Sequence, residues 1–232
     1  MAFIEFKNVI KQYGEKDNTV YALNGASFSI EQGEFVVIVG PSGAGKSTVL
    51  NLLGGMDKAS GGEIIVGGQK THTFTDKQLT DYRAKEIGFI FQFYNLIPNL
   101  TVYENIALIK EVAKDFVGVE YALESVGLLD HKNKFPAQLS GGEQQRVSIA
   151  RAIVKNPSVL LCDEPTGALD SNTGVIILSL LQRMARNGRT VIIVTHNTAL
   201  EAAADKIIKI KNGKINEVIK NASPLAVEEV SW

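Results

Sequence analysis

A glycine-rich segment between a strand-like run and a helix-like run constrains the fold of this chain more than any other feature. Residues 35–39 are apolar and mostly β-branched, which predicts a buried strand, and residues 49–53 predict a helix. Between them lie, in order, Gly40, Pro41, Ser42, Gly43, Ala44, Gly45, Lys46, Ser47 and Thr48. Glycines let the backbone bend tightly and approach an anion, so that successive N–H groups and the helix N-terminus point at one phosphate. We therefore predict a phosphate-binding loop in which Lys46 neutralises β- and γ-phosphate charge and Ser47 holds Mg²⁺.

Composition limits the kind of domain to which this loop can belong. The chain has 232 residues, of which 45% are hydrophobic and 21% charged, as expected for one large globular domain. Its 24 basic and 25 acidic residues form no long run of either sign, so no broad nucleic-acid surface is expected. No apolar run approaches the roughly 18 residues of a membrane span and no secretory leader is evident, so we expect a cytoplasmic location. The single cysteine, Cys162, is expected to be a buried apolar residue.

Hydrophobic patterning predicts a mainly parallel α/β core with an inserted helical subdomain at residues 93–155. The core, residues 1–92 and 156–220, is expected to carry strands at 3–9, 26–30, 35–39, 63–66, 88–91, 159–162 and 191–194, and helices at 76–85 and 173–186. The first two strands form an opening sheet edge and are separated by a polar loop at 14–19. Asn212 and Gly213 predict a hairpin with a type I′ turn between runs 206–211 and 214–219. The tail, residues 221–232, has no assignment.

Two carboxylates follow the apolar run 159–162, where a parallel sheet presents its ligand-binding edge. Adjacent carboxylates are costly in a core, but they are suited to a metal ion and a reacting water. We expect Asp163 to support Mg²⁺ and Glu164 to polarise the attacking water. A solvated acidic turn before Pro165 is the alternative.

Two further polar residues follow expected strands. Gln92 comes after the run 88–91, and its amide could orient a water or contact Mg²⁺. His196 comes after the run 191–195, where an imidazole could sense a γ-phosphate, although a lone histidine there is more often structural. Tyr13, before the polar loop, could stack on a nucleotide base or pack half-buried.

A second glycine-containing helix start lies far along the chain from Lys46. Ser140 with Glu143 three residues later predicts a capping box, which is a sufficient structural role for the serine. Capping does not account for Gly141 and Gly142, because a hydroxyl with two approachable N–H groups also forms an anion cradle. We expect this cradle to serve a phosphate held by another copy of the chain.

Together these motifs resemble the nucleotide-binding domain of ABC transporters over nearly the whole chain. The resemblance assigns Walker A to 40–48, the Q-loop to Gln92, the signature to 139–146, Walker B with its catalytic glutamate to 159–165, the D-loop to 168–170 with Asp170, the H-loop to His196 and adenine stacking to Tyr13. It implies a P-loop NTPase fold of the ABC type with a parallel core sheet, an antiparallel β subdomain and the helical insert. It also implies ATP and Mg²⁺, and a homodimer that holds ATP between one chain's 40–48 and the other's 140–142. The implied location is the inner face of the membrane, through an integral-membrane permease and without nucleic acid.

Segments 52–57, 88–98 and 165–170 further resemble ATPases of the macrolide-export and lipoprotein-release group. This implies a transporter of peptides, antibiotics or lipoproteins, with export or mechanotransmission as its mode. A division-site or other signalling ATPase with a permease-like partner is the alternative. Asn197 departs from the aspartate that is common after the histidine in this group. The apolar residues among 93–100 are expected to contact the permease, with internal packing as the alternative; they include Phe93, Tyr94, Leu96 and Ile97.

Overall fold

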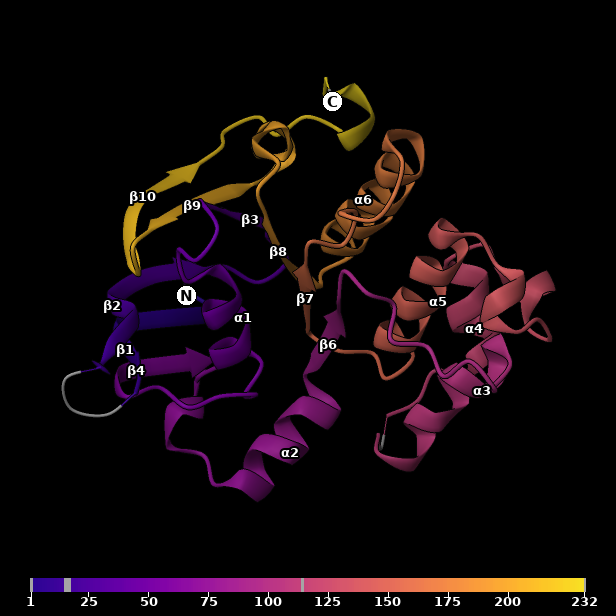
Figure 1. Ribbon diagram of the computed structural model, residues 1–232, viewed down its shortest axis with the longest axis horizontal. Helices are drawn as coiled ribbons and strands as arrows, with labels where there is room; N and C mark the ends of the chain where they lie inside the picture. The colour runs from indigo at the N-terminus through magenta and orange to yellow at the C-terminus, as the bar shows by residue number, and fades with distance from the viewer. Residues whose placement is uncertain (1, 15–17, 114, 232) are drawn as a thin grey trace.

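The structure, a computed structural model, describes residues 2–14, 18–113 and 115–231. At its centre is a six-stranded sheet in the order β10-β9-β3-β8-β7-β6 (Figure 1). Its strands are β3 (Phe35–Val39), β6 (Ile87–Ile90), β7 (Val159–Asp163), β8 (Thr190–Thr195), β9 (Lys206–Lys211) and β10 (Lys214–Lys220). Every pairing is parallel except that of β10 with β9, which confirms the mainly parallel core. The carboxyl ends of β3, β6, β7 and β8 therefore meet at one edge.

Strand β3 is buried on both faces, which explains its uninterrupted apolar sequence. Side chains alternate between the faces of a strand. Phe35, Val37 and Val39 accordingly belong to one buried cluster, which includes residues of helices α5 (Gly141–Ile153) and α6 (Ser171–Arg186). Val36 and Ile38 belong to a second cluster, shared with helix α1 (Lys46–Leu53) and the first strands of the chain. The phosphate loop thus begins at the end of the most enclosed strand of the sheet.

A four-stranded antiparallel sheet in the order β2-β1-β4-β5 forms the β subdomain. It comprises β1 (Ile4–Tyr13), β2 (Val20–Ile30), β4 (Gly61–Val66) and β5 (Gln69–Lys70). The first two strands are longer than predicted, because backbone pairing continues to Tyr13 and Val20 despite the polar side chains there. Within the expected loop, residues 15–17 lie outside the described residues. Strand β5 was not predicted.

The helical insert stands to one side of the core sheet, away from the β subdomain (Figure 1). It contains α3 (Val102–Ala107), α4 (Val119–Ser125) and α5, joined by the 3₁₀ turns Leu108–Glu111, Leu129–His131 and Pro136–Gln138. Residues 93–101 carry no helix, so the helical part begins later than predicted. Thr101 and Ser140 each form a capping box that fixes the start of α3 and of α5.

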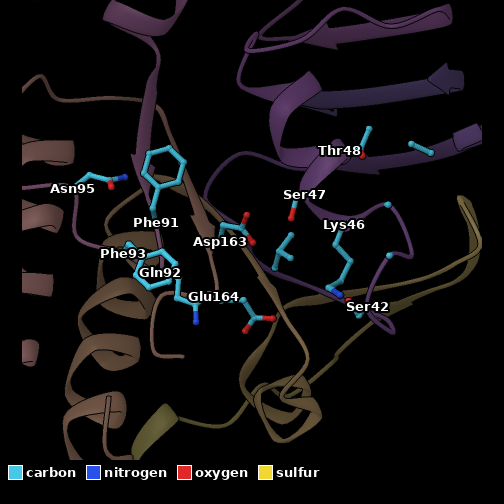
Figure 2. A pocket seen from close by; sticks show the side chains of 14 residues that line it. Ser42, Lys46, Ser47, Thr48, Phe91, Gln92, Phe93, Asn95, Asp163 and Glu164 are labelled. Atoms are coloured by element: carbon cyan, nitrogen blue, oxygen red, sulfur yellow. The ribbon is translucent and has the colours of Figure 1, made fainter. Parts of the chain in front are cut away.

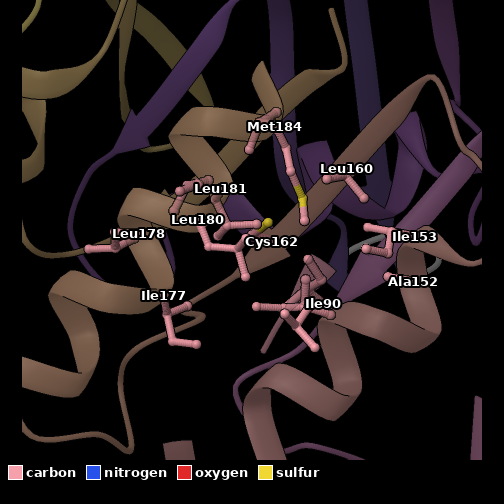
Figure 3. Close-up of a cluster of buried hydrophobic side chains, with 14 of the residues drawn as sticks. Ile90, Ala152, Ile153, Leu160, Cys162, Ile177, Leu178, Leu180, Leu181 and Met184 are labelled. Carbon is pink, nitrogen blue, oxygen red and sulfur yellow. The ribbon is translucent and has the colours of Figure 1, made fainter. Parts of the chain in front are cut away.

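Helices α2 (Asp76–Lys85) and α6 follow the predicted bounds closely. Helix α6 packs its apolar stripe on the sheet, where Cys162 lies among Ile177, Leu181 and Met184 (Figure 3). Burial raises the pKa of the Cys162 thiol far above its ordinary value, as expected for a buried apolar residue.

The predicted hairpin is confirmed, with positive φ at both Asn212 and Gly213, as a type I′ turn requires. Its first strand also pairs in parallel with β3, which ties the hairpin to the core sheet. The tail adds the 3₁₀ turn Val227–Glu229 and buries Val227 against α6. The short 3₁₀ turns Thr71–Thr73 and Thr198–Ala203 complete the described elements. Among the described residues, no helix combines the length and apolarity needed to cross a bilayer.

Candidate functional site

The glycine loop connects the end of β3 to the start of α1, as the sequence predicted. Gly45 has a φ of 106°, which favours glycine, and a Cβ there would collide with the carbonyl oxygen of Ala22. A Cβ at Gly40 would collide with the carbonyl oxygen of Ile210. Glycine is therefore needed at these two positions because the loop packs closely on β2 and β9. This requirement is independent of the approach to a ligand. Gly43, with a φ of 73°, has open space around its Cα.

The ammonium group of Lys46 is held in place by backbone carbonyl groups of its own loop. Its Nζ donates hydrogen bonds to the carbonyl oxygens of Gly40 at 2.8 Å and Pro41 at 3.0 Å. A cleft of about 560 Å³ opens beside it and is lined by residues of the loop and of the neighbouring strand ends. Figure 2 shows Lys46, Ser47, Gln92, Asp163 and Glu164 around this cleft. Residues distant in sequence thus meet at the carboxyl edge of the sheet, as predicted.

Asp163, the last residue of β7, is partly buried beside Ser47 and Lys46. Burial raises the pKa of its carboxyl group, and the charge of Glu164 raises it further. A hydrogen bond with the Ser47 side chain and the charge of Lys46 act in the opposite direction. A desolvated carboxylate next to a hydroxyl is an oxygen pair that suits a divalent cation.

The carboxylate of Glu164 is held in place by the end of β8. Its Oε2 accepts a hydrogen bond from Thr195 Oγ1 at 3.0 Å, and its Oε1 accepts one from the backbone N–H of His196 at 3.0 Å. The same Oε1 lies 2.9 Å from His196 Nδ1. Glu164 also has a φ of 48°, an uncommon conformation for a residue with a side chain. These contacts fix the direction of the carboxylate, which lines the cleft.

His196 thus contacts Glu164 directly, a relation that the sequence did not reveal. Its side chain is 78% exposed and is absent from the lining of the Lys46 cleft. The neighbouring Asn197 caps the turn Thr198–Ala203, since its Oδ1 accepts a hydrogen bond from the Ala199 N–H at 3.0 Å. Asparagine therefore serves locally as a cap at the position where the resembling group commonly has aspartate.

Tyr13 lies beside the far end of the loop rather than among the residues that line the cleft. Its hydroxyl donates to Asp57 Oδ2 at 2.7 Å, and the Nζ of Lys11 lies 4.7 Å from its ring centroid. A hydrogen bond with the side chain of Thr48 also acts on its hydroxyl, while burial and Asp57 raise the pKa of Tyr13. The ring is 44% exposed, so one side remains open to a partner. The contact with Asp57, which anchors this ring, was not predicted from the sequence.

Ser140 caps α5 as predicted, because its Oγ accepts a hydrogen bond from the Glu143 N–H at 3.3 Å. The two glycines that follow have reasons within the chain that the sequence analysis did not foresee. A Cβ at Gly142 would collide with Cγ2 of Thr173, and one at Gly141 would lie 2.8 Å from the hydroxyl of Tyr94. The described Lys46 cleft does not include this helix start. Close packing within one chain is therefore one reason for the glycine pair, and its role as an anion cradle stays a prediction.

Asp170 also has a structural role, as the N-cap of α6. Its Oδ1 accepts a hydrogen bond from the Thr173 N–H at 3.0 Å. The same hydrogen bonding lowers the pKa of Asp170. Ala22, Phe91, Asn95 and Thr195 are further residues at or next to the cleft that the sequence did not indicate.

The contact between α5 and α6 makes a stability prediction. Gly142→Ala is expected to lower the free energy of unfolding by about 1–3 kcal/mol, because the new methyl group meets a stiff β-branched side chain. Thr173→Ser removes the opposing methyl group, so Gly142→Ala in that background is expected to be neutral or slightly stabilising. Denaturant unfolding of the two single variants and the double variant measures this coupling. Equal effects of Gly142→Ala in both backgrounds would contradict the packing explanation.

The fold and the cleft define a P-loop nucleoside triphosphatase. A family model described as ABC transporter matches residues 23–167. The chain is 44% identical over 99% of its length to MG065 of Mycoplasma genitalium, named as an ABC transporter ATP-binding protein, and covers 50% of it. It is also 44% identical over 93% of its length to the macrolide export ATP-binding/permease protein MacB of Mannheimia succiniciproducens, and covers 34% of it. The chain therefore spans half or less of these two relatives.

A solved structure gives the same result. The ATP-binding cassette MJ0796 of Methanocaldococcus jannaschii, in a dimeric post-hydrolysis state bound to ADP and Pi, matches with a TM-score of 0.84 and 41% identity. The match covers 94% of this chain and 98% of that one. The chain belongs to the ABC transporter family and has the fold of an ATP-binding cassette.

Proposed function

We propose that this chain binds ATP with Mg²⁺ and hydrolyses it to drive a membrane permease of an export or mechanotransmission system. The observation that carries the proposal is the cleft in which Lys46, Asp163, Glu164 and Gln92 meet. Substrates of the permease are expected to be peptides, antibiotics or lipoproteins, and the similarity to the macrolide export protein MacB supports the antibiotic class. The chain would then lie on the inner face of the membrane through its permease, with no nucleic-acid partner.

The roles follow from the contacts at the strand ends. The backbone N–H groups of the loop and Lys46 bind the phosphates, and Tyr13 stacks on the adenine. Glu164, fixed by Thr195 and His196, accepts the proton of the attacking water. Gln92, which follows the neighbouring strand β6, orients that water.

Mg²⁺ fits the oxygen atoms of the site. The ion typically takes one or two protein ligands and keeps waters and substrate phosphates as the others. The Ser47 hydroxyl and the desolvated Asp163 carboxylate supply such ligands, with the Gln92 amide at reach of the same cleft. When bound, the ion neutralises phosphate charge.

The helix start at Ser140 supplies the rest of the site from a second copy of the chain. This proposal is supported by the dimeric state of the MJ0796 cassette and by the position of Ser140 outside the Lys46 cleft. In such a dimer, Ser140, Gly141 and Gly142 bind the phosphates held by the partner's loop, with Asp170 nearby.

The proposed permease contact involves a smaller set of residues than the sequence indicated. Phe93 is 74% exposed and Ile97 is 44% exposed, whereas Leu96 packs against the core cluster. Tyr94 is only partly exposed, with its hydroxyl close to Gly141. Leu96 is thus partly buried, as the alternative of internal packing expects, and Phe93 and Ile97 are the exposed residues of the proposed contact.

Ile97→Asp is expected to lower recovery of the permease by at least about tenfold, because a charge replaces apolar surface at the centre of a contact. The measurement is co-purification with the tagged chain from detergent-solubilised membranes, with the permease identified by mass spectrometry. Leu225→Asp is the matched control, since Leu225 is 42% exposed but lies in the tail. Full recovery with Ile97→Asp would remove this surface, and absence of any integral-membrane partner of the wild-type chain would overturn the transport role.

A further inference from the structure

A buried glutamine joins the helical subdomain to the two strand ends that carry Gln92 and Glu164. Gln145 lies on α5 and is completely buried. Its Nε2 donates hydrogen bonds to the carbonyl oxygen of Phe91 at 3.2 Å and to that of Pro165 at 2.8 Å. Phe91 directly precedes Gln92, and Pro165 directly follows Glu164. One amide group therefore contacts the backbone next to both site residues.

The two site residues stand on different strands, so their relative position needs such a link. Gln92 follows β6 and Glu164 follows β7, and both point into the same cleft (Figure 2). The ladder between β6 and β7 ends at the pair Ile90 and Cys162, before either site residue. Beyond that pair, Gln145 links the two segments by its hydrogen bonds to Phe91 and Pro165 and so fixes their separation.

A second side chain of helix α5 also donates hydrogen bonds to the segment after β6. Arg151 donates hydrogen bonds to the carbonyl oxygens of Asn95 at 2.6 Å and Tyr94 at 2.8 Å. Residues 91–95 are thus attached to α5 at two levels, about 1.7 turns apart along the helix. The segment that carries Glu164 and Pro165, by contrast, receives one hydrogen bond from the described residues of α5, and Gln145 donates it. The orientation of α5 is therefore transmitted to the Glu164 side through Gln145.

We infer that Gln145 is a positioning residue that sets Gln92 and Glu164 in catalytic register only when α5 has the orientation seen here. This inference rests on the roles proposed above for those two residues. It couples the helix whose N-terminus carries Ser140 to the hydrolytic step inside the same chain. The hydrogen bonds of Gln145 go to Phe91 and Pro165 and not to residues 40–48, so ATP affinity is not part of its role.

Loss of the amide is expected to affect turnover rather than binding. Without the two hydrogen bonds, the backbone at Phe91 and Pro165 can shift, and a displacement of about 1 Å in a reacting group costs up to about a hundredfold in rate. For Gln145→Met, which has a similar length and no donor, we expect kcat to fall about tenfold or more. KM for ATP is expected to change less than about twofold, because residues 40–48 are untouched.

Gln182 provides a matched control on α6. It is also a buried glutamine whose Nε2 donates to two backbone carbonyl oxygens, those of Ala203 at 3.0 Å and Leu225 at 2.9 Å. Those carbonyls lie in the turn Thr198–Ala203 and the tail, and Gln182 is absent from the cleft. Its Oε1 also accepts a hydrogen bond from the Val227 N–H at 3.2 Å. Gln182→Met therefore removes the same two donor contacts and this one, and tests whether loss of stability alone lowers turnover.

The experiment measures kcat, KM and thermal unfolding for the wild-type chain, Gln145→Met and Gln182→Met. The expected result is a selective fall in kcat for Gln145→Met, with Gln182→Met retaining wild-type kcat at a comparable loss of Tm. If Gln145→Met does not fold, Gln145→Ala, which cannot overpack the site, is measured in the same way. Unchanged kcat in the folded Gln145 variant, or an equal fall with Gln182→Met, would overturn the inference alone. A wild-type chain without turnover would overturn the proposed roles of Glu164 and Gln92 as well.

Discussion

Glu164→Gln is expected to leave ATP binding intact and to slow hydrolysis by on the order of a hundredfold or more. Glutamine has the same shape, and its remaining carbonyl oxygen can still accept a hydrogen bond from the His196 N–H or from Thr195. What it loses is the ability to accept a proton from the attacking water. The measurement is steady-state turnover together with equilibrium binding of ATP.

Glu201→Gln is the control for this prediction. Glu201 is a nearby carboxylate whose Oε2 lies 3.5 Å from Lys209 Nζ, outside the Lys46 cleft. Its substitution is expected to leave turnover near the wild-type value. Near-normal turnover of Glu164→Gln would remove Glu164 from the role of general base and leave it as a residue that orders the end of β8.

The central part of the fold was predictable because its sequence signals are local. An uninterrupted apolar strand, a glycine loop and a helix start occur within residues 35–53, and the structure places them as expected. Likewise, Asp163 and Glu164 stand at the end of a buried strand in a parallel sheet, and this places them at the ligand-binding edge. The turn at Asn212 and Gly213 was equally readable, since type I′ geometry demands residues that tolerate positive φ.

The remaining features depend on contacts between distant segments. The link between Glu164 and His196 needs β7 and β8 to be neighbours in a defined register, which no local pattern reveals. The glycine pair at 141–142 is a further case, because its close packing against Thr173 and Tyr94 was not foreseen, and its role as an anion cradle stays a prediction. Gln145 was part of a recognised motif, yet its two acceptors lie 54 and 20 residues away in sequence.

The claim that each ATP site is shared between two chains predicts an all-or-none difference between two heterodimers. Lys46→Ala removes the cation of the phosphate loop, and Ser140→Arg fills the proposed cradle with a long side chain. If one chain carries Lys46→Ala and its partner carries Ser140→Arg, both defects fall into one shared site and the other site stays intact. If one chain carries both substitutions and the partner is wild type, each shared site receives one defect.

The most direct measurement is the amount of ATP trapped per purified heterodimer in a Glu164→Gln background, with the two chains isolated by different tags. This background separates capture from turnover, so cooperative firing of the two sites does not affect the result. A shared site predicts about one trapped ATP in the split pair and almost none in the pair with the double-mutant chain. More ATP trapped by the double-mutant and wild-type pair than by the split pair would contradict the account, and Ser140 would then be only the cap of α5.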